Sequence, residues 1–365
     1  MWALPFVAGF TPTTRCFAPH IRGLRRTAGA FMPEGPECTI HAERLHAACS
    51  GSRIVRADIL SGRYSGSGQV AGRGSPPERW SMLQDALPLT IDSVHSKGKF
   101  IYWLLESPTI SLWSTLGMTG AWSLMPSEHA RLRLVLSSTG ALDEEWPLYY
   151  NDQRNFGTIT VCDDPAMLED KLSSLGPSWL APSGLGLDAF RELAGRQCAS
   201  KRSRAVPLAR WLMDQGKTSG IGNYILSESL YLARLYPWAC CGDLADEDWV
   251  ALHAAITDVI ARSYHSQNAL ADSQAAAAEG SVAPAASSAG QGQGQGQRMA
   301  SSAGQGQVRS RTLSSTRGTT YTFELHVFRR TSTADGLAVR QDEGPHKRSV
   351  HWVPERQVRA RVDQT

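Results

Sequence analysis

Hydrophobic and polar positions alternate over several short stretches in the first half of the chain. The clearest are residues 100–105, 110–113 and 131–136, which are rich in leucine, β-branched or aromatic side chains. Such runs, partly alternating with period two, are typical of strands that bury one face. Residues 37–48 follow a helical period instead, because Ile40, Leu45 and Ala48 fall on one stripe. We therefore expect residues 32–180 to form a β-rich domain with a helix near its start.

The pattern becomes helical after residue 185. Apolar side chains recur at helical spacing through residues 246–263, at Trp249, Leu252, Ala255, Ile256, Val259 and Ile260. Such a stripe is more often a core-facing surface than a functional one. Residues 185–265 are therefore predicted to form a helical domain.

A low-complexity segment follows the predicted helices. Residues 266–319 are dominated by alanine, serine, glycine and glutamine, including a Gly-Gln repeat. This composition cannot bury enough apolar surface to fold, so we expect the segment to be disordered. Strand-like patterning resumes at residues 323–328 and again at 349–354, and the two predicted strands would form a hairpin around the turn at 335–336.

Bulk composition adds few limits. The chain has 365 residues, enough for two cores, and its net charge of +3 identifies no partner. Its seven cysteines form no Cys-x-x-Cys, so no zinc ribbon is visible, and no apolar run is long enough to suggest a membrane span. Residues 1–31 contain four arginines and no acidic residue, which is typical of an organelle transit peptide. The alternative is an unused upstream start that leaves Met32 as the true start.

Residues 32–37, Met-Pro-Glu-Gly-Pro-Glu, carry the strongest indication of chemistry. If Met32 is the initiator and is removed, Pro33 becomes the chain terminus, with an amine whose pKa is near ~8. Such an amine beside the carboxylate of Glu34 is suited to attack a sugar C1′ and form a Schiff base. The alternative interpretation is a turn-rich loop. In the chain as written, however, Met32 acylates Pro33, and an amide nitrogen is not a nucleophile.

Four separated segments resemble the Fpg/Nei DNA glycosylases, in the order in which that family carries them. They are residues 32–37, residues 96–100 with 116–120, residues 150–157, and residues 220–228 with 234–237. The end of the chain departs from the four-cysteine zinc finger of the bacterial members, because no cysteine follows Cys241. Residues 327–357 instead resemble the zincless finger of plant, fungal and some animal members. The resemblance thus implies neither a metal nor an organic cofactor.

The resemblance implies an α+β multidomain fold. Its parts would be an N-terminal two-layered β-sandwich flanked by helices, a C-terminal helical domain with a helix–two-turn–helix, and a zincless-finger β-hairpin. The expected boundaries are 1–31 for the leader or unused start, 32–180 for the catalytic sandwich, 185–265 for the helix–two-turn–helix domain, 266–319 for the disordered insert, 320–357 for the finger and 358–365 for a tail.

The resemblance also implies roles for particular residues. Pro33 would attack C1′, Glu34 would protonate the deoxyribose ring oxygen, and Glu37 would help to position water or Pro33. Contacts to the DNA backbone are expected from Lys99, Asn223 and Arg348. The space left by an everted nucleotide would be filled by Met118, Arg154 and Phe156, since kinking proteins insert such wedges into DNA.

The function implied is that of a bifunctional DNA glycosylase and AP lyase of base excision repair. It would excise oxidised bases from damaged double-stranded DNA, with formamidopyrimidines as the main substrates and 8-oxoguanine as a further candidate. It would then nick the strand by β- or β,δ-elimination. The alternative is a non-catalytic protein that binds damaged DNA, if Pro33 is never exposed. We expect a monomer in the nucleus, or in the mitochondrion or chloroplast if residues 1–31 are a transit peptide.

Overall fold

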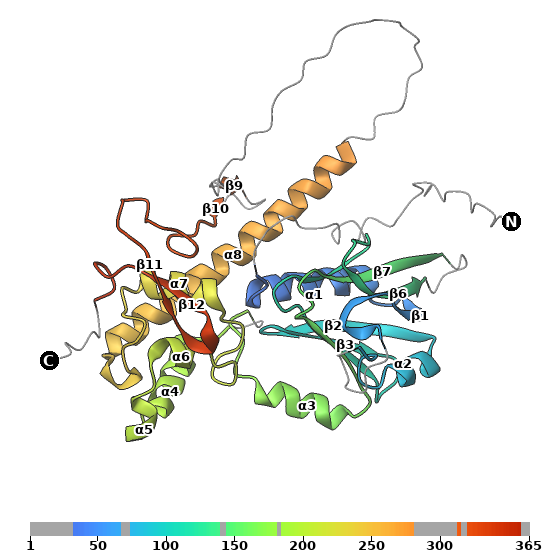
Figure 1. Cartoon of the computed structure of the whole chain (residues 1–365), viewed down its shortest axis with the longest axis horizontal. Coiled ribbons are helices and arrows are strands. Elements are labelled where there is room, and N and C mark those ends of the chain that lie inside the picture. The colour runs from blue at the N-terminus through green and yellow to red at the C-terminus, as the bar shows by residue number, and fades with distance from the viewer. Residues whose placement is uncertain are drawn as a thin grey trace, which may run out of the picture.

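The computed structural model describes residues 32–66, 74–138, 144–180, 184–280, 312–314 and 320–358. Predictions for residues 1–31, for most of the low-complexity insert and for most of the tail lie outside these ranges. Figure 1 shows a sheet-rich domain and a helical domain side by side, with α3 (Pro165–Ser174) leading from one to the other. No helix in the described ranges is both long and apolar enough to cross a membrane.

The sheet-rich domain is built from eight antiparallel strands. Their order is β5-β7-β6-β1-β2-β3-β4-β8. The strands are β1 (Arg53–Ile59), β2 (Leu89–Lys97), β3 (Phe100–Leu105), β4 (Ser111–Thr115), β5 (Gly120–Ser123), β6 (Ala130–Ser137), β7 (Glu145–Asp152) and β8 (Thr158–Cys162). The array folds over into two layers, because Trp103 of β3 packs against Trp122 of β5 at 5.3 Å although these strands are far apart in the order. The predicted sandwich is confirmed.

Two helices flank the sandwich, α1 (Gly35–Cys49) and the short α2 (Trp80–Ala86). Helix α1 places Ala42, Leu45 and Cys49 in the sandwich core. It begins two residues before the predicted position because Pro36 lies in its first turn, where proline's fixed φ suits a helix and its missing N–H costs nothing.

The helical domain closes around an aromatic core. Its helices are α4 (Leu187–Gln197), α5 (Lys201–Arg204), α6 (Leu208–Met213), α7 (Asn223–Leu232) and α8 (Asp246–Gly280), with a short 3-10 turn at Cys241–Asp243. Phe190 packs against Trp211 and Trp249 at centroid distances of 5.7 and 5.9 Å. The predicted helical domain is therefore confirmed.

Helix α8 is longer than predicted. It continues to Gly280, so the disorder expected from residue 266 is wrong for residues 266–280. The physical reason at the start of this stretch is contact with α1: Tyr264 donates a hydrogen bond to Glu43, and Gln267 donates one to Glu37. Farther along, short strands β9 (Thr312–Ser314) and β10 (Thr320–Thr322) pair with each other.

The C-terminal hairpin keeps its predicted second strand, which lies within residues 349–354, but its first strand differs from the prediction. Its strands are β11 (Arg340–Glu343) and β12 (Ser349–Trp352), joined through a turn at Pro345–Lys347. The strand predicted at 323–328 is wrong, because three successive backbone N–H groups there donate to the buried Glu228 carboxylate, at 2.7–2.9 Å, instead of to a neighbouring strand. Glu228 thereby ties this segment to α7.

Candidate active site

The carboxylate of Glu34 lies at the junction of the two domains. Only 2% of Glu34 is exposed. Its oxygens accept hydrogen bonds from the backbone N–H groups of Gly222, Tyr224 and Ile225, at 2.9, 2.9 and 3.2 Å. These groups form the N-terminus of α7, where unpaired N–H groups favour a negative charge. The segment before α1 is thus docked on the turn between α6 and α7, and Gly35 N–H reinforces the contact by donating to Gly220 O at 2.9 Å.

The environment of Glu34 raises its pKa to about 7. Burial is the main cause, because a buried carboxylate loses its hydration. The positive charge of Lys99 and the N–H bonds from α7 oppose this effect but do not cancel it. A carboxyl group with a pKa near neutrality can both donate and accept a proton, which is the property that general acid–base catalysis requires.

Pro33 lies directly before Glu34 and is half-buried. Its nitrogen is bonded to Met32, whose side chain packs against the core of the helical domain. The residue before Pro33 is therefore seated at the junction. Glu37, one turn into α1, accepts the backbone N–H of Glu34 at 2.9 Å and the hydroxyl hydrogens of Tyr224 and Ser263, each at 3.0 Å. Glu37 thus fixes the backbone beside Pro33.

Lys99 reaches the same site from the turn between β2 and β3. Its Nζ donates to the carbonyl of Ile221 at 2.8 Å. Burial lowers the pKa of Lys99, and the nearby charge of Arg348 lowers it further. Gly222 makes this arrangement possible, because a Cβ there would lie 2.3 Å from the Glu34 carboxyl carbon and 2.6 Å from Lys99 Nζ. Any side chain at position 222 would displace one of these groups.

Asn223 and Arg348 connect the site to the hairpin. The Asn223 amide donates to the Ser349 carbonyl at 2.7 Å, and the residue is buried. Asn223 therefore holds the hairpin against α7, a contact that the sequence did not predict. Arg348 is exposed, and it directly precedes Ser349, whose carbonyl Asn223 holds at the start of α7. Hence Lys99, Asn223 and Arg348, expected together from the sequence, lie around one site.

The three predicted wedge residues lie on two neighbouring loops of the sandwich. Met118 is half-buried in the loop between β4 and β5, while Arg154 and Phe156 are exposed in the loop between β7 and β8. The Arg154 guanidinium lies 5.1 Å from the centre of the Phe156 ring, a favourable cation–π geometry. Phe156 is 55% exposed, so more than half of its surface is accessible to a partner.

Asp152 joins these two loops, and sequence reasoning missed it. It is fully buried, and it accepts the Thr119 hydroxyl hydrogen at 2.6 Å and the Gly157 N–H at 2.7 Å. Thr119 in turn accepts the N–H of Arg154 at 2.9 Å. One carboxylate thus fixes the backbone on both sides of the wedge residues. The available signal was its place between Tyr150 and Arg154, inside a motif already identified.

Named protein families and named proteins resemble this sequence. A family profile described as Formamidopyrimidine-DNA glycosylase N-terminal domain matches residues 32–159, and one described as Formamidopyrimidine-DNA glycosylase H2TH domain matches residues 185–273. A Formamidopyrimidine-DNA glycosylase of Thermus thermophilus is 30% identical over 236 residues, covering 64% of this chain and 76% of that protein. The one from Arabidopsis thaliana is 30% identical over 247 residues, and the match spans only 58% of that protein.

Solved structures resemble the fold as well. The structure of MutM (Fpg) from Thermus thermophilus matches with a TM-score of 0.58 and 23% identity, covering 89% of this chain and 98% of that one. Lactococcus lactis Fpg bound to DNA with an AP site matches with a TM-score of 0.58 and 18% identity, covering 89% and 99%. Within the described ranges, no group of three or more His, Cys, Asp or Glu side chains could hold a metal ion.

Proposed function

The chain belongs to the formamidopyrimidine-DNA glycosylase family, and we propose that it is a DNA glycosylase and AP lyase of base excision repair. One observation carries this proposal: Glu34, with a pKa of about 7, adjoins Pro33 and is held by the N-terminus of α7. The site thus has a proton donor beside a potential amine nucleophile. That pairing is what Schiff-base chemistry at a sugar carbon needs.

The proposed reaction begins when the free amine of Pro33 attacks C1′ of the damaged nucleotide. Glu34 gives its proton to the ring oxygen, the base leaves, and an iminium forms between Pro33 and the opened sugar. The iminium makes the C2′ hydrogen acidic, so its removal expels the 3′-phosphate by β-elimination. Glu37 contributes by holding the backbone N–H of Glu34, which keeps Pro33 and Glu34 in one geometry.

DNA would bind across the junction between the domains. Lys99 and Arg348 supply positive charge near Glu34, and Asn223 supports the hairpin that carries Arg348. We assign Met118, Arg154 and Phe156 to the space left when the damaged nucleotide turns out of the stack. This assignment is supported by the exposure of Phe156 and by its contact with Arg154.

We propose formamidopyrimidines as the preferred substrates, because the relatives that match carry that name. A protein with this activity works where DNA is found, the nucleus or a DNA-containing organelle, and we propose that it acts as a monomer. The competing function, binding of damaged DNA without chemistry, is favoured by one specific observation. Met32 is bonded to Pro33 and packs into the helical domain, so the amine in this chain is blocked.

Replacing Arg348 with alanine should weaken binding to damaged and undamaged duplex alike. A contact to a DNA phosphate depends on charge and not on base sequence. Its loss should therefore lower the slope of log K against log salt by about 1. Fluorescence anisotropy over a salt series measures both effects. Arg340→Ala is the matched control, because Arg340 is also exposed on the hairpin. Equal slopes for the Arg348 variant and the parent chain would remove Arg348 from the interface.

Replacing Asp152 with asparagine should destabilise the protein by about 1–3 kcal/mol, because an amide nitrogen would face a buried donor. It should also reduce binding to a duplex with an abasic-site analogue more than binding to undamaged duplex, since only the former needs the wedge. Urea unfolding and anisotropy measure these effects. Asp170→Asn, an exposed change on α3, is the control. An equal loss on both duplexes would assign Asp152 to stability alone.

A further inference from the structure

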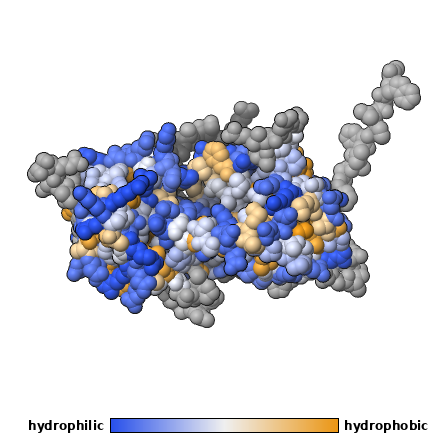
Figure 2. Space-filling view, turned by 90° about the horizontal axis from the view of Figure 1, so that it is seen from below, coloured by the Kyte–Doolittle hydropathy of each residue, from blue (hydrophilic) through white to orange (hydrophobic). Residues whose placement is uncertain are grey.

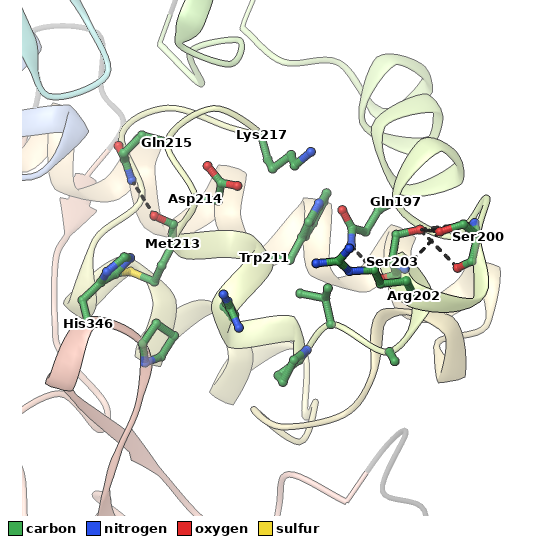
Figure 3. Close-up of a pocket in the computed structure, with 15 residues that line it drawn as sticks. Gln197, Ser200, Arg202, Ser203, Trp211, Met213, Asp214, Gln215, Lys217 and His346 are labelled. Atoms are coloured by element: carbon green, nitrogen blue, oxygen red, sulfur yellow. Dashed lines mark hydrogen bonds between the residues drawn. The ribbon is translucent and has the colours of Figure 1, made fainter.

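An open hollow of about 1040 Å³ lies in the helical domain, outside the site described above. Figure 3 shows its lining, with His346 and Gln215 at one end and Arg202 and Ser200 at the other. Its floor includes Trp211, which packs against Phe190 and Trp249 at 5.7 and 5.3 Å. One wall of the hollow is therefore fixed by the core of the helical domain.

Positive side chains surround this hollow. Arg202, Arg210 and Lys217 line it and are exposed, and within the described part of the chain none of them forms an ion pair or a side-chain hydrogen bond. The one carboxylate in the lining, Asp214, accepts the N–H of Gly216 at 2.9 Å and so serves its own turn. Figure 2 shows that the helical-domain end of the molecule, at the left of that view, is largely hydrophilic. The hollow thus has an unneutralised positive charge and suits an anion with several charged groups.

The hollow shares a wall with the proposed active site. Gln215 accepts the N–H of Gly220 at 2.9 Å and donates to the carbonyl of Ile221 at 2.9 Å. The same Ile221 carbonyl accepts from Lys99. Gln215, which lines the hollow, is therefore bonded directly to the turn that holds Glu34.

The hairpin turn links the two places from the other side. His346 lines the hollow, whereas Arg348, two residues later, adjoins Ser349, whose carbonyl accepts a hydrogen bond from Asn223 at the start of α7 at 2.7 Å. His346 and Lys347 both have left-handed backbone, with φ of 59° and 56°, which is uncommon for residues other than glycine. Such a twist sends neighbouring side chains in different directions. The hairpin turn thus carries Arg348 beside the start of α7 and His346 at the edge of the hollow.

We infer that the hollow binds backbone phosphates of the duplex arm on one side of the lesion, an inference that rests on the proposed function. Continuity with Arg348 favours DNA over an acidic peptide, because a duplex held at Arg348 carries a regular row of phosphates onward. The contact is backbone-directed and independent of base sequence. It lengthens the footprint on one arm only, since the hollow lies on one side of the site.

The test compares two duplexes that carry the same abasic-site analogue. Each has one arm of half a helical turn, about 5 base pairs, and one of about 15 base pairs, with the long arm on opposite sides of the lesion. The variant is Arg202→Gln/Arg210→Gln in the full chain. Its control is Arg53→Gln/Arg56→Gln, which also removes two positive charges. These residues lie on β1, which follows the C-terminal end of α1, whereas Glu34 lies at the N-terminal end of that helix.

We expect the Arg202/Arg210 variant to bind one of the two duplexes about tenfold more weakly than the parent chain does. For that duplex the slope of log K against log salt should fall by about 2. The other duplex should bind to the variant as it does to the parent chain. Retained binding of the second duplex also shows that the variant is folded. Equal loss on both duplexes, or none on either, would overturn the inference. Loss of binding to a poly-glutamate peptide, without an arm-specific effect on DNA, would make the hollow a protein-docking site instead. If the parent chain bound neither duplex, the proposed function itself would fail.

Discussion

In the chain whose first residue is Pro33, replacing Glu34 with glutamine should reduce base excision by about 10²–10⁴-fold, the usual contribution of a positioned general acid. Glutamine has nearly the same shape but no proton to give to the sugar ring oxygen. Binding to an abasic-site analogue should weaken far less than excision, because Glu34 faces the N-terminus of α7. Some stability should be lost, since both oxygens of Glu34 accept buried N–H groups and the glutamine amide nitrogen would face one of them. Single-turnover excision and anisotropy separate the two effects. Turnover close to that of the Pro33 form with Glu34 intact would remove Glu34 from the mechanism.

The same substitution should change how stability depends on pH. The folded pKa of Glu34, about 7, is above its ordinary value of 4.5, so the folded state binds the proton more tightly than the unfolded state. This contribution is fully present below about pH 4.5 and is lost as the pH rises through 7. The shift corresponds to a loss on the order of 3 kcal/mol between those limits. The difference in unfolding free energy between parent and Glu34→Gln should follow this curve, and a difference independent of pH would contradict it.

Freeing the amine of Pro33 should change activity more than any substitution. With Met32 attached, the Pro33 nitrogen is an amide whose lone pair is delocalised into the carbonyl, so it cannot attack C1′. A chain beginning at Pro33 has a secondary amine that is partly unprotonated at neutral pH. We therefore expect lyase activity on abasic DNA from the Pro33 form and none above background from the chain that retains Met32.

The pH profile of the Pro33 form follows from the same two groups. Its rate should fall at low pH, where the amine is protonated, and at high pH, where Glu34 has lost its proton. The ammonium form of Pro33 also lowers the pKa of the adjacent carboxyl group, so fewer molecules combine a neutral amine with a protonated Glu34 and the maximal rate is reduced. A rate that rises steadily up to pH 10 would contradict a protonated Glu34 as the acid.

Local patterns in the sequence predicted most of the regular structure. The strand expected at residues 100–105 has those bounds in β3, and the helix expected from residue 246 begins there in α8. In both cases apolar periodicity and burial agree. The fold class could also be predicted, because four motifs in order resemble a family whose profiles match residues 32–159 and 185–273.

The errors arose where a distant partner decides the local structure. Residues 323–328 have the composition of a strand, but the buried Glu228 carboxylate takes their N–H groups. Residues 266–268 begin a low-complexity segment, yet contact with α1 keeps the chain helical there. Asp152 was missed for a related reason: its importance lies in Thr119, a partner on another loop. The first two contacts have no signature in the local sequence, and Asp152 had only its place inside the motif at residues 150–157.

Borohydride trapping on a duplex with an abasic site tests the central claim most directly. Borohydride reduces an iminium to a stable amine, so a Schiff base becomes a covalent protein–DNA complex. The parent chain is compared with two chains that start at position 33. One begins with Pro33, and the other carries Pro33→Gly, which replaces the proline amine with a primary terminal amine. Our account predicts trapping by both forms with a free terminal amine and none by the chain that retains Met32. Equal trapping by the chain that retains Met32 would show that another amine forms the Schiff base, and no trapping by any form would leave a protein that binds damaged DNA without cutting it.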